Sequence, residues 1–264
     1  MKERRTSIRT RAPLALGVGA AVLATALAGA AAGAGGVTAS ANSSCPIRSG
    51  AGKHVHRKCL KPSDFVPRVS NPWFPLKPGS RWHYQGIKEH KRMVDDVRAT
   101  HRTKRILGVR TTVVHDVVSV RGRPIEVTDD YYAQDRRGNV WYFGENTKEL
   151  DHNGNVKSRE GSFLAGRKGA RAGLFFPADP HVGAEARQEF FKGHAEDHFK
   201  VIQRNAPVSV PFVTTDRAIR TKEWTPLEPK TLDNKYYVRG VGTVREIAVK
   251  GPTERLELVS FNQG

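Results

Sequence analysis

Short β-type runs separated by turn residues fill the chain from residue 65 onward, and this pattern restricts the fold more than any other feature. Residues 80–86 place Trp82 and Tyr84 two positions apart, which is the period of a half-buried strand. Residues 111–120 are dense in Val and Thr, whose branched side chains crowd a helix and fit a pleated sheet. No segment keeps the apolar period of a helix over three turns.

The sequence therefore predicts a mostly β fold with a single antiparallel β domain over residues 65–264. A domain of about ten to twelve short strands forms either a half-barrel or a sandwich. Residues 135–139 and 151–155 combine Asp, Asn and Gly, which suit the positive φ angles of tight hairpin turns. Residues 161–183 are rich in Gly, Pro and Ala and are expected to form a long loop.

The first 41 residues have the three parts of a secretory signal peptide. Residues 1–13 hold five basic residues and one acidic residue, residues 14–32 are apolar, and Ala39-Ser40-Ala41 forms a small-residue exit site. We expect cleavage after Ala41, which leaves no transmembrane segment in a protein that is secreted or associated with the cell envelope. Removal of these residues lowers the net charge from +18 to +14, so the mature protein itself is basic.

Residues 42–64 are rich in Ser, Gly, Lys, Arg and His, and we interpret them as a flexible basic arm before the β domain. The arm contains both cysteines of the chain, Cys45 and Cys59. An exported protein meets an oxidising compartment, so we expect a Cys45–Cys59 disulfide. The alternative is a metal site that adds His54 and His56, because thiolates and imidazoles bind zinc, but the spacing fits no established zinc pattern.

Common catalytic motifs are missing from the sequence. It has no G-x-S-x-G, no H-E-x-x-H, no phosphate-binding loop and no dinucleotide-binding glycine pattern. His194 and His198 would share one face of a helix, but on a strand they stand about 13 Å apart and cannot hold one metal ion. The flanking sequence favours the strand. We therefore assign no catalytic residue, no metal ligand and no cofactor, and an enzyme is the least favoured class.

Acidic residues occur in pairs at Asp95-Asp96 and Asp129-Asp130. Neighbouring residues on a strand point to opposite faces of the sheet, so neither pair converges by itself. Glu126, Asp130 and Glu145 could meet across a hairpin, as the two carboxylates of glycoside hydrolysis do. On so basic a chain, ion pairs with Arg or Lys are the expected role of these carboxylates.

Aromatic residues gather in the predicted strands and in the predicted loop. Phe175 and Phe176 would each cost about 1.5–3 kcal/mol if left in water, so we expect this loop to be a lid over an apolar cavity. The alternative role of these aromatic side chains is ordinary core packing. The predicted pocket for a lipid or another apolar small molecule is formed by Trp82, Tyr84, Tyr132, Trp141, Phe143, Phe175 and Phe176.

Several sequence phrases occur together, among them residues 71–82 (NPWFPLKPGSRW), 138–145 (GNVWYFGE), 222–229 (KEWTPLEP) and 236–242 (YYVRGVG). In this order they resemble an uncharacterised family of exported β-rich proteins of high-GC Gram-positive bacteria. More distantly, the F-P-L-x-P-G opening and the late Y-x-x-G-V-G strand resemble half-barrel carriers of lipids and lipoproteins. This second resemblance implies a curved antiparallel sheet around an apolar cavity, and neither resemblance supplies a catalytic residue.

Basic residues cluster in the predicted turns, where they favour either solubility or attraction to an anionic surface. Export makes nucleic acid an unexpected partner and anionic cell-wall polymers an expected one. The sequence thus favours a non-catalytic, envelope-associated protein that binds an apolar or amphipathic ligand in a concave sheet. The alternative is a structural protein that adheres to anionic polymers through its predicted anion-binding residues, Arg102, Lys104, Arg105, Arg136 and Arg137.

Overall fold

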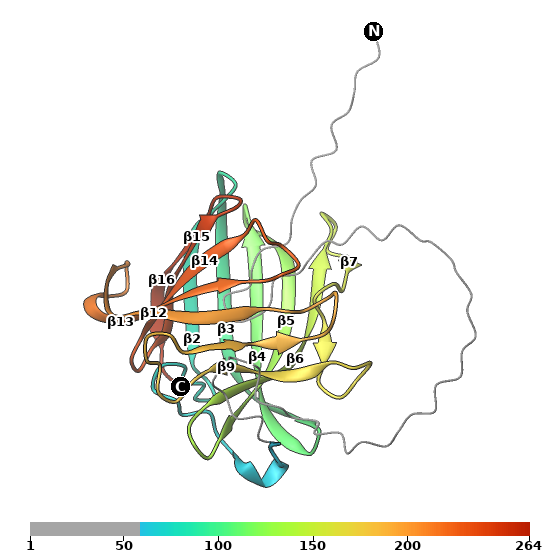
Figure 1. Ribbon diagram of the computed structural model, residues 1–264. Helices are drawn as coiled ribbons and strands as arrows, with labels where there is room; N and C mark the ends of the chain where they lie inside the picture. Colours follow the sequence, from blue (N-terminus) through green and yellow to red (C-terminus); the bar gives the residue numbers. More distant parts are fainter. Residues whose placement is uncertain (1–58) are drawn as a thin grey trace.

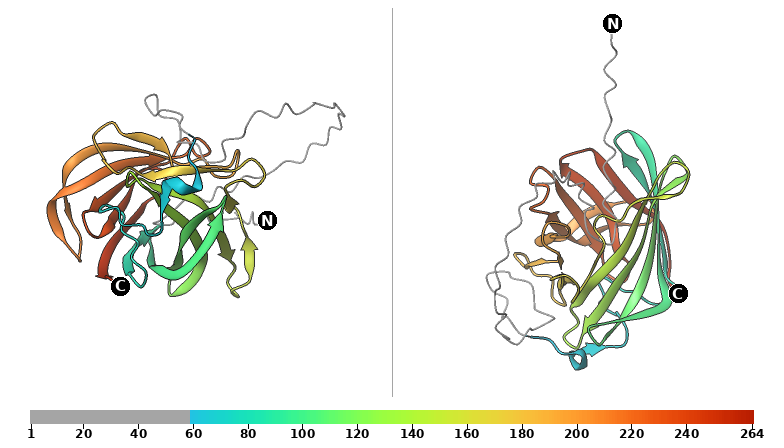
Figure 2. Two further views of the ribbon diagram at one scale, coloured as in Figure 1. Left: turned by 90° about the horizontal axis from the view of Figure 1, so that it is seen from below. Right: turned by 90° about the vertical axis from the view of Figure 1, so that its right-hand side faces the viewer.

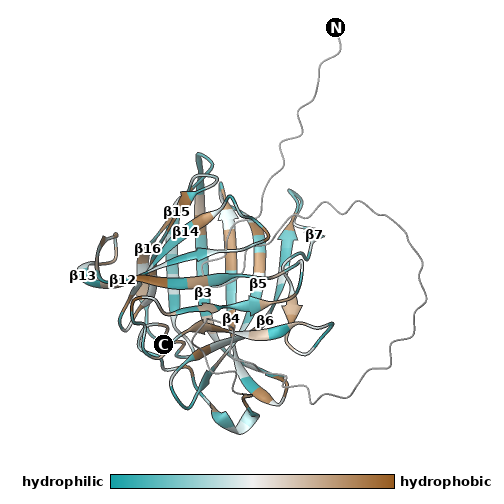
Figure 3. Ribbon diagram, viewed as in Figure 1, coloured by the Kyte–Doolittle hydropathy of each residue, from teal (hydrophilic) through white to brown (hydrophobic). Residues whose placement is uncertain are grey.

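Antiparallel strands make up most of the computed structural model, which describes residues 59–264 (Figure 1). Figure 3 shows hydrophilic and hydrophobic residues interspersed along the strands. Buried and half-buried residues alternate along strands such as β14 (Leu232–Val238), which therefore turns one face inward. A short 3-10 helix, η1 (Pro62–Asp64), precedes the first strand. The strands are β1 (Phe65–Val66), β2 (Arg81–Lys88), β3 (Lys91–Ile106), β4 (Val109–Val120), β5 (Arg123–Asp135), β6 (Val140–Leu150), β7 (Val156–Ser158), β8 (Phe163–Leu164), β9 (Arg171–Phe176), β10 (Glu185–Arg187), β11 (Glu189–Phe190), β12 (His198–Ser209), β13 (Thr214–Trp224), β14 (Leu232–Val238), β15 (Gly242–Lys250) and β16 (Glu254–Asn262).

The two ends of the sheet meet, so the sheet closes into a barrel. Its strand order is β10-β12-β13-β14-β15-β16-β2-β3-β4-β5-β6-β9-β11, and only Gln188 separates β10 from β11 in the chain. Glu185 of β10 lies opposite Lys200 of β12, and Glu189 of β11 lies opposite Ala172 of β9. The continuous β10–β11 segment therefore bonds to β12 on one side and to β9 on the other. Figure 2 shows the strands curving around a common interior.

Gly173 of β9 lies where the closure is tightest. A β-carbon at this position would stand 2.2 Å from the Gln188 carbonyl oxygen and 2.6 Å from the Arg187 carbonyl oxygen. The Gln188 backbone N–H donates to the Asp197 carbonyl at 2.7 Å, and its side-chain amide donates to the Phe175 carbonyl at 3.4 Å. Backbone thus approaches backbone with no room for a side chain, and only glycine permits this.

The segment between β1 and β2, residues 67–80, closes one end of the barrel, and we call it the plug segment (Figure 1). Its Phe74 ring packs into the interior against Tyr132 and Phe175, with ring centroids 5.2 Å and 4.6 Å away. The Asn71 side-chain amide donates to the Gly138 carbonyl at 2.8 Å and holds the plug segment to the β5–β6 turn. This end of the interior is filled by packed aromatic rings.

A second apolar cluster lies on the other face of β5 and β6. Trp141 and Phe143 alternate with the inward-facing Tyr142, so they point away from the barrel interior. Phe65 of β1 covers them, with ring centroids 6.4 Å from Trp141 and 5.4 Å from Phe143. The wall formed by β5 and β6 is therefore buried on both faces.

The predicted mostly β fold with a single antiparallel domain is confirmed, and its sheet closes as a barrel and does not form a sandwich. The turn predicted at residues 135–139 is also confirmed, because the Asp135 N–H donates to the Asn139 carbonyl at 2.9 Å. The predicted signal peptide, Cys45 and the arm up to residue 58 lie outside the described residues. The Cys45–Cys59 disulfide therefore stays a prediction.

The loop expected over residues 161–183 is wrong in part, because this stretch contains strands β8 and β9. Phe175 and Phe176 are consecutive residues of β9 and are both buried in the barrel interior cluster. The glycine content suggested a loop, but Gly173 serves the close approach at the barrel closure. A mobile lid built on these two phenylalanines does not fit a strand of the barrel wall.

The substitution Gly173→Ala is expected to destabilise the barrel, because its methyl group would overlap backbone atoms of the β10–β11 segment. Overpacking of this kind costs about 2–3 kcal/mol, which corresponds to a fall of roughly 5–10 °C in melting temperature. The control is Gly122→Ala, where φ is +76° but no atom lies within 4 Å of the added carbon. The control should lose only about 1 kcal/mol, and equal losses in thermal unfolding would contradict the close approach.

Candidate functional site

Carboxylate side chains line the barrel interior beyond the aromatic cluster. Asp95 shares its face of β3 with Met93, and Asp116 shares its face of β4 with Val114, and both apolar neighbours belong to the interior cluster. The same alternation places other acidic residues inward along β5, β6 and the C-terminal strands. These interior carboxylates, all buried, are Asp95, Asp116, Glu126, Asp130, Glu145, Glu149, Glu189, Asp197, Glu223, Asp233, Glu246 and Glu254.

Two lysines share this interior with the carboxylates. The Lys235 Nζ lies 3.1 Å from Glu223 Oε2 and 3.5 Å from Glu246 Oε2. Burial lowers the pKa of Lys235, but these two carboxylates raise it well above the usual lysine value, so this lysine stays charged. The second lysine is Lys88, whose Nζ lies 3.0 Å from Glu254 Oε2. Two ammonium groups cannot neutralise twelve ionised carboxylates, so most of the carboxyls must be held in another way.

Burial and mutual repulsion favour the protonated form of several interior carboxylates. The carboxyl oxygens of Asp95 and Asp116 are buried, and none of them has a hydrogen-bond partner among the described residues. Burial raises the pKa of Asp116 to about 6. Burial also raises the pKa of Asp95 well above its usual value, and the negative charge of Asp116 adds to this shift. Burial also raises the pKa of Glu145 and Glu189, and their negative neighbours add to the shift. Burial therefore favours an interior with less negative charge than its composition suggests.

Asp130 and Glu145 lie directly opposite each other on β5 and β6, as a hairpin contact predicts. Asp130 Oδ1 accepts a hydrogen bond from the Tyr142 hydroxyl at 3.0 Å, and Glu145 Oε2 accepts one from the Thr147 hydroxyl at 2.5 Å. The ion pairs with Arg or Lys expected for them are not found among the described residues. The prediction missed that these carboxyls point into a closed interior, where a neutral carboxyl is favoured over an ion pair.

A cavity of about 560 Å³ lies at the barrel end opposite the plug segment, among the tips of the β2–β3, β4–β5 and β6–β7 hairpins. We call it the hairpin-end cavity. Its lining combines apolar side chains, five basic side chains and three acidic ones. It consists of Lys88, Glu89, Lys91, Val120, Arg121, Arg123, Pro124, Ile125, Glu149, Leu150, Asp151, His152 and Lys157.

The seven aromatic residues of the predicted pocket fall into two groups. The structure brings Trp82, Tyr84, Tyr132, Phe175 and Phe176 together in the barrel interior, whereas Trp141 and Phe143 belong to the cluster on the opposite face. The space beside Trp82, Tyr84 and Tyr132 measures about 20 Å³, which is room for a single water molecule. The described rings are packed against one another, and the larger hollow lies at the hairpin end.

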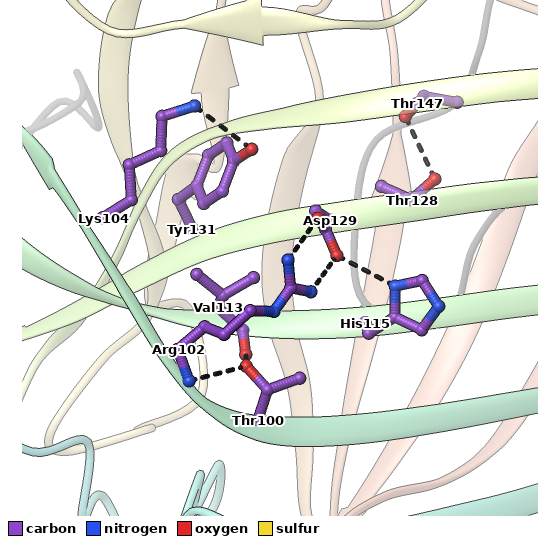
Figure 4. A network of polar contacts seen from close by, with 9 residues as sticks. All are labelled: Thr100, Arg102, Lys104, Val113, His115, Thr128, Asp129, Tyr131 and Thr147. Atoms are coloured by element: carbon purple, nitrogen blue, oxygen red, sulfur yellow. Dashed lines mark hydrogen bonds and ion pairs between the residues drawn. The ribbon is translucent and has the colours of Figure 1, made fainter.

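The predicted anion-binding residues lie at the surface, and the structure gives most of them local partners. Arg102 forms a bidentate ion pair with Asp129 at 2.7 and 3.0 Å (Figure 4). The Lys104 Nζ lies 4.3 Å from the centre of the Tyr131 ring. Two guanidinium groups donate to backbone carbonyls at 2.9 Å, from Arg105 to Gly108 and from Arg136 to Ser63, and Arg137 is exposed in the β5–β6 turn.

His194 and His198 lie at a turn and at the start of a strand, as the flanking sequence predicts. His194 Nδ1 is 2.9 Å from Glu160 Oε1, and the His198 ring stacks on Trp224 with centroids 5.4 Å apart. Burial lowers the pKa of His198. The two imidazoles thus have separate partners in the described part of the chain.

Sequence reasoning missed both the interior carboxylates and the hairpin-end cavity. The signal for the carboxylates was present, because Glu126, Thr128, Asp130 and Tyr132 occupy every second position of one strand. Acidic residues are seldom buried, so a pattern of alternate acidic residues does not by itself predict a buried strand face. The cavity had no such signal, because three hairpin tips that are distant in sequence form it.

No protein-family model matches the chain, and no curated protein is similar to it in sequence. Three solved structures resemble it at low similarity. An exported-protein candidate with a YmcC-like fold from Bacteroides fragilis has 12% identity, covers 72% of this chain and 98% of its own, and gives a TM-score of 0.41. A lipoprotein candidate from Parabacteroides distasonis has 11% identity, covers 73% of this chain and 99% of its own, and also gives 0.41.

The third structure is a β-barrel-like protein of a domain of unknown function from Brucella abortus, with 12% identity, coverage of 75% of this chain and 99% of its own, and a TM-score of 0.37. Similarities of this size carry no argument about what this chain does. Within residues 59–264, no helix has the length and hydrophobicity that a membrane crossing requires.

The substitution Asp116→Asn is expected to stabilise the protein near pH 8 and to have little effect near pH 4. The pKa of Asp116 rises from 3.8 to about 6 on folding, so its stabilising contribution is full below pH 3.8 and is lost as the pH rises through 6. At higher pH the folded protein carries a cost of about 3 kcal/mol, which the neutral amide avoids.

Denaturant unfolding at several pH values measures this effect. The amide that the substitution introduces has nearly the shape of the carboxyl and carries no charge at any pH, so the substitution changes the charge and keeps the packing. The matched control is Asp179→Asn at an exposed position, which should leave the pH profile unchanged. A gain in stability that is the same near pH 4 and near pH 8 would contradict protonation of the buried carboxyl.

Proposed function

We propose that the protein is an exported, non-catalytic binding protein that takes an amphipathic ligand with an acidic head group in its hairpin-end cavity. The observation that carries this proposal is the lining of the cavity, which joins apolar wall residues to a basic rim. Its volume of about 560 Å³ lies within the range of about 300–1,000 Å³ typical of small-molecule sites. Export rests on the signal peptide expected from residues 1–41.

The cavity offers an apolar wall where an alkyl chain would lie. Val120, Ile125 and Leu150 are half-buried residues that line it, and Pro124 adds a further apolar surface. Burial of apolar surface contributes roughly 25 cal/mol per Å² and has no directional requirement, so such a wall favours hydrocarbon without selecting one chain.

The cavity also carries a surplus of positive charge. Four basic residues stand at its rim, and a fifth, Lys88, lies deeper; the four are Lys91, Arg121, Arg123 and Lys157. Only three of the lining residues are acidic. One of these three, Asp151, already accepts hydrogen bonds from the backbone N–H groups of residues 153 and 155 at 2.9 Å. The remaining positive charge favours a carboxylate or phosphate head group.

Fluorescence titration with a dansyl-labelled fatty acid and with its neutral methyl ester tests this proposal. The acid is expected to bind about tenfold more tightly than the ester, which corresponds to about 1.4 kcal/mol. Charge reversal in Arg123→Glu should remove this preference and leave ester binding unchanged, because Arg123 is at the exposed rim. The substitution Ile125→Ser should weaken both probes.

The control for this titration is Arg204→Glu, an exposed charge reversal on β12 outside the cavity lining. It should bind both probes as the unmodified protein does. The proposal fails if Arg123→Glu and Arg204→Glu weaken acid binding equally, or if neither probe binds the unmodified protein.

Adhesion to anionic cell-wall polymers is a second candidate function, and the charge distribution between the two faces of the barrel favours it. Twelve carboxylates and only two lysines lie in the interior, so the exterior is more basic than the net charge indicates. A basic exterior attracts polyanions without a shaped site.

Retention on purified cell walls, with and without their anionic polymers, tests adhesion. Retention should disappear between about 0.1 M and 1 M salt, because the Debye length falls from about 10 Å to about 3 Å. Combined charge reversal at Arg105, Arg136 and Arg137 should weaken it severalfold. Equal retention on stripped walls would show that the basic exterior serves solubility only.

A further inference from the structure

The outer face of the barrel carries a second hollow, of about 340 Å³, over strands β16, β2, β3 and β4. Its lining includes Arg81, Arg98, His115 and Asn262. It belongs neither to the hairpin-end cavity nor to the predicted anion-binding residues. We call it the outer-face hollow.

Strand register places four of its side chains in one row. Asn262 pairs with Arg81, Arg81 pairs with Arg98, and Arg98 pairs with His115. Directly paired residues of antiparallel strands point to the same face, with β-carbons about 4.5–5.5 Å apart. Two guanidinium groups are therefore immediate neighbours in the middle of the row.

The two arginines have no partner within residues 59–264, whereas the other charged groups nearby do. His83 Nδ1 lies 2.7 Å from Asp96 Oδ1, which accounts for the carboxylate in the hollow. Asp129, beside the row, is held by Arg102 and by His115 Nδ1 at 2.9 Å (Figure 4).

Burial raises the pKa of Asp129, but hydrogen bonds from His115 and Arg102 lower it to about 2, so this carboxylate stays ionised and occupied. Like charges directly opposite on neighbouring strands destabilise a sheet. The Arg81–Arg98 pair therefore repels, and neither guanidinium forms an ion pair within residues 59–264, so an anion in the hollow would offset the repulsion.

We propose that the outer-face hollow binds a phosphate group. Each planar guanidinium presents parallel N–H donors that fit two oxygens of a phosphate, and two adjacent guanidinium groups can share one such anion. His115 Nδ1 faces Asp129, so the neutral ring offers Nε2 as an acceptor for the hydroxyl of a monoprotonated phosphate. The Asn262 amide adds a donor. This site is independent of the function proposed for the hairpin-end cavity.

Thermal unfolding with inorganic phosphate, against chloride at equal ionic strength, tests the site in the unmodified protein and in Arg98→Gln. Phosphate should raise the melting temperature of the unmodified protein, and Arg98→Gln should bind phosphate at least tenfold more weakly. In chloride the variant should be at least as stable as the unmodified protein, because it removes a like-charge contact. Arg81→Gln should behave in the same way.

The matched control is Arg110→Gln, because Arg110 pairs with Arg105 across β3 and β4 in a second arginine pair that does not line this hollow. It should keep the phosphate response. The proposal is overturned if Arg98→Gln and Arg110→Gln weaken phosphate binding equally. It is also overturned if the unmodified protein neither responds to phosphate nor binds phosphatidylglycerol vesicles.

The vesicle measurement separates the two sources of a phosphate group. Vesicle binding that depends on Arg81 and Arg98 without a response to free phosphate would support the site and identify a lipid head group as its ligand. The dansyl fatty acid titration in Arg98→Gln should match the unmodified protein. Failure of the phosphate site would therefore leave the hairpin-end cavity unaffected, and the reverse also holds.

Discussion

Closure of the sheet into a barrel depends on the close contact between Gly173 and the backbone of Arg187 and Gln188. Through it the β10–β11 segment bonds to both edge strands, and the sheet becomes a barrel. Once the barrel is closed, the pleat of every strand sends alternate side chains into the interior and to the outer face. This separation of inward-facing from outward-facing side chains gives the packed aromatic rings, the interior carboxylates, the hairpin-end cavity and the outer-face hollow.

Two neighbouring aspartates show how strongly the pKa of a carboxyl depends on the face of the sheet to which it points. Asp129 and Asp130 are adjacent on β5, yet their carboxyls titrate in opposite directions. Burial, with the negative charge of Glu145 added, raises the pKa of Asp130, whereas two hydrogen-bond donors on the outer face lower that of Asp129 to about 2. Burial therefore favours the protonated form of one aspartate, whereas hydrogen bonding favours the ionised form of its neighbour on the same strand.

Local patterning was enough to predict strands β2 and β4, the hairpin turn at residues 135–139 and the opposite faces of Asp95 and Asp96. It could not predict closure, because the partner of Gly173 is decided by a backbone approach from the β10–β11 segment. The glycine that permits this approach is also typical of loops, which is why the sequence predicts a loop where β9 lies. The outer-face hollow was missed because its arginines, at positions 81 and 98, become neighbours only through the β2–β3 register.

The two hollows lie at opposite ends of one strand. Arg81, the first residue of β2, lines the outer-face hollow, and Lys88, the last residue of β2, lines the hairpin-end cavity. Seven strand rises separate these residues by roughly 23 Å, and they point to opposite faces of the sheet. A single small anion cannot reach both, so the hollows act on separate ligands or on separate groups of a long one. A polymer that follows the basic exterior could contact the arginine pair while the cavity holds a different molecule, and the barrel wall between them keeps the two events apart.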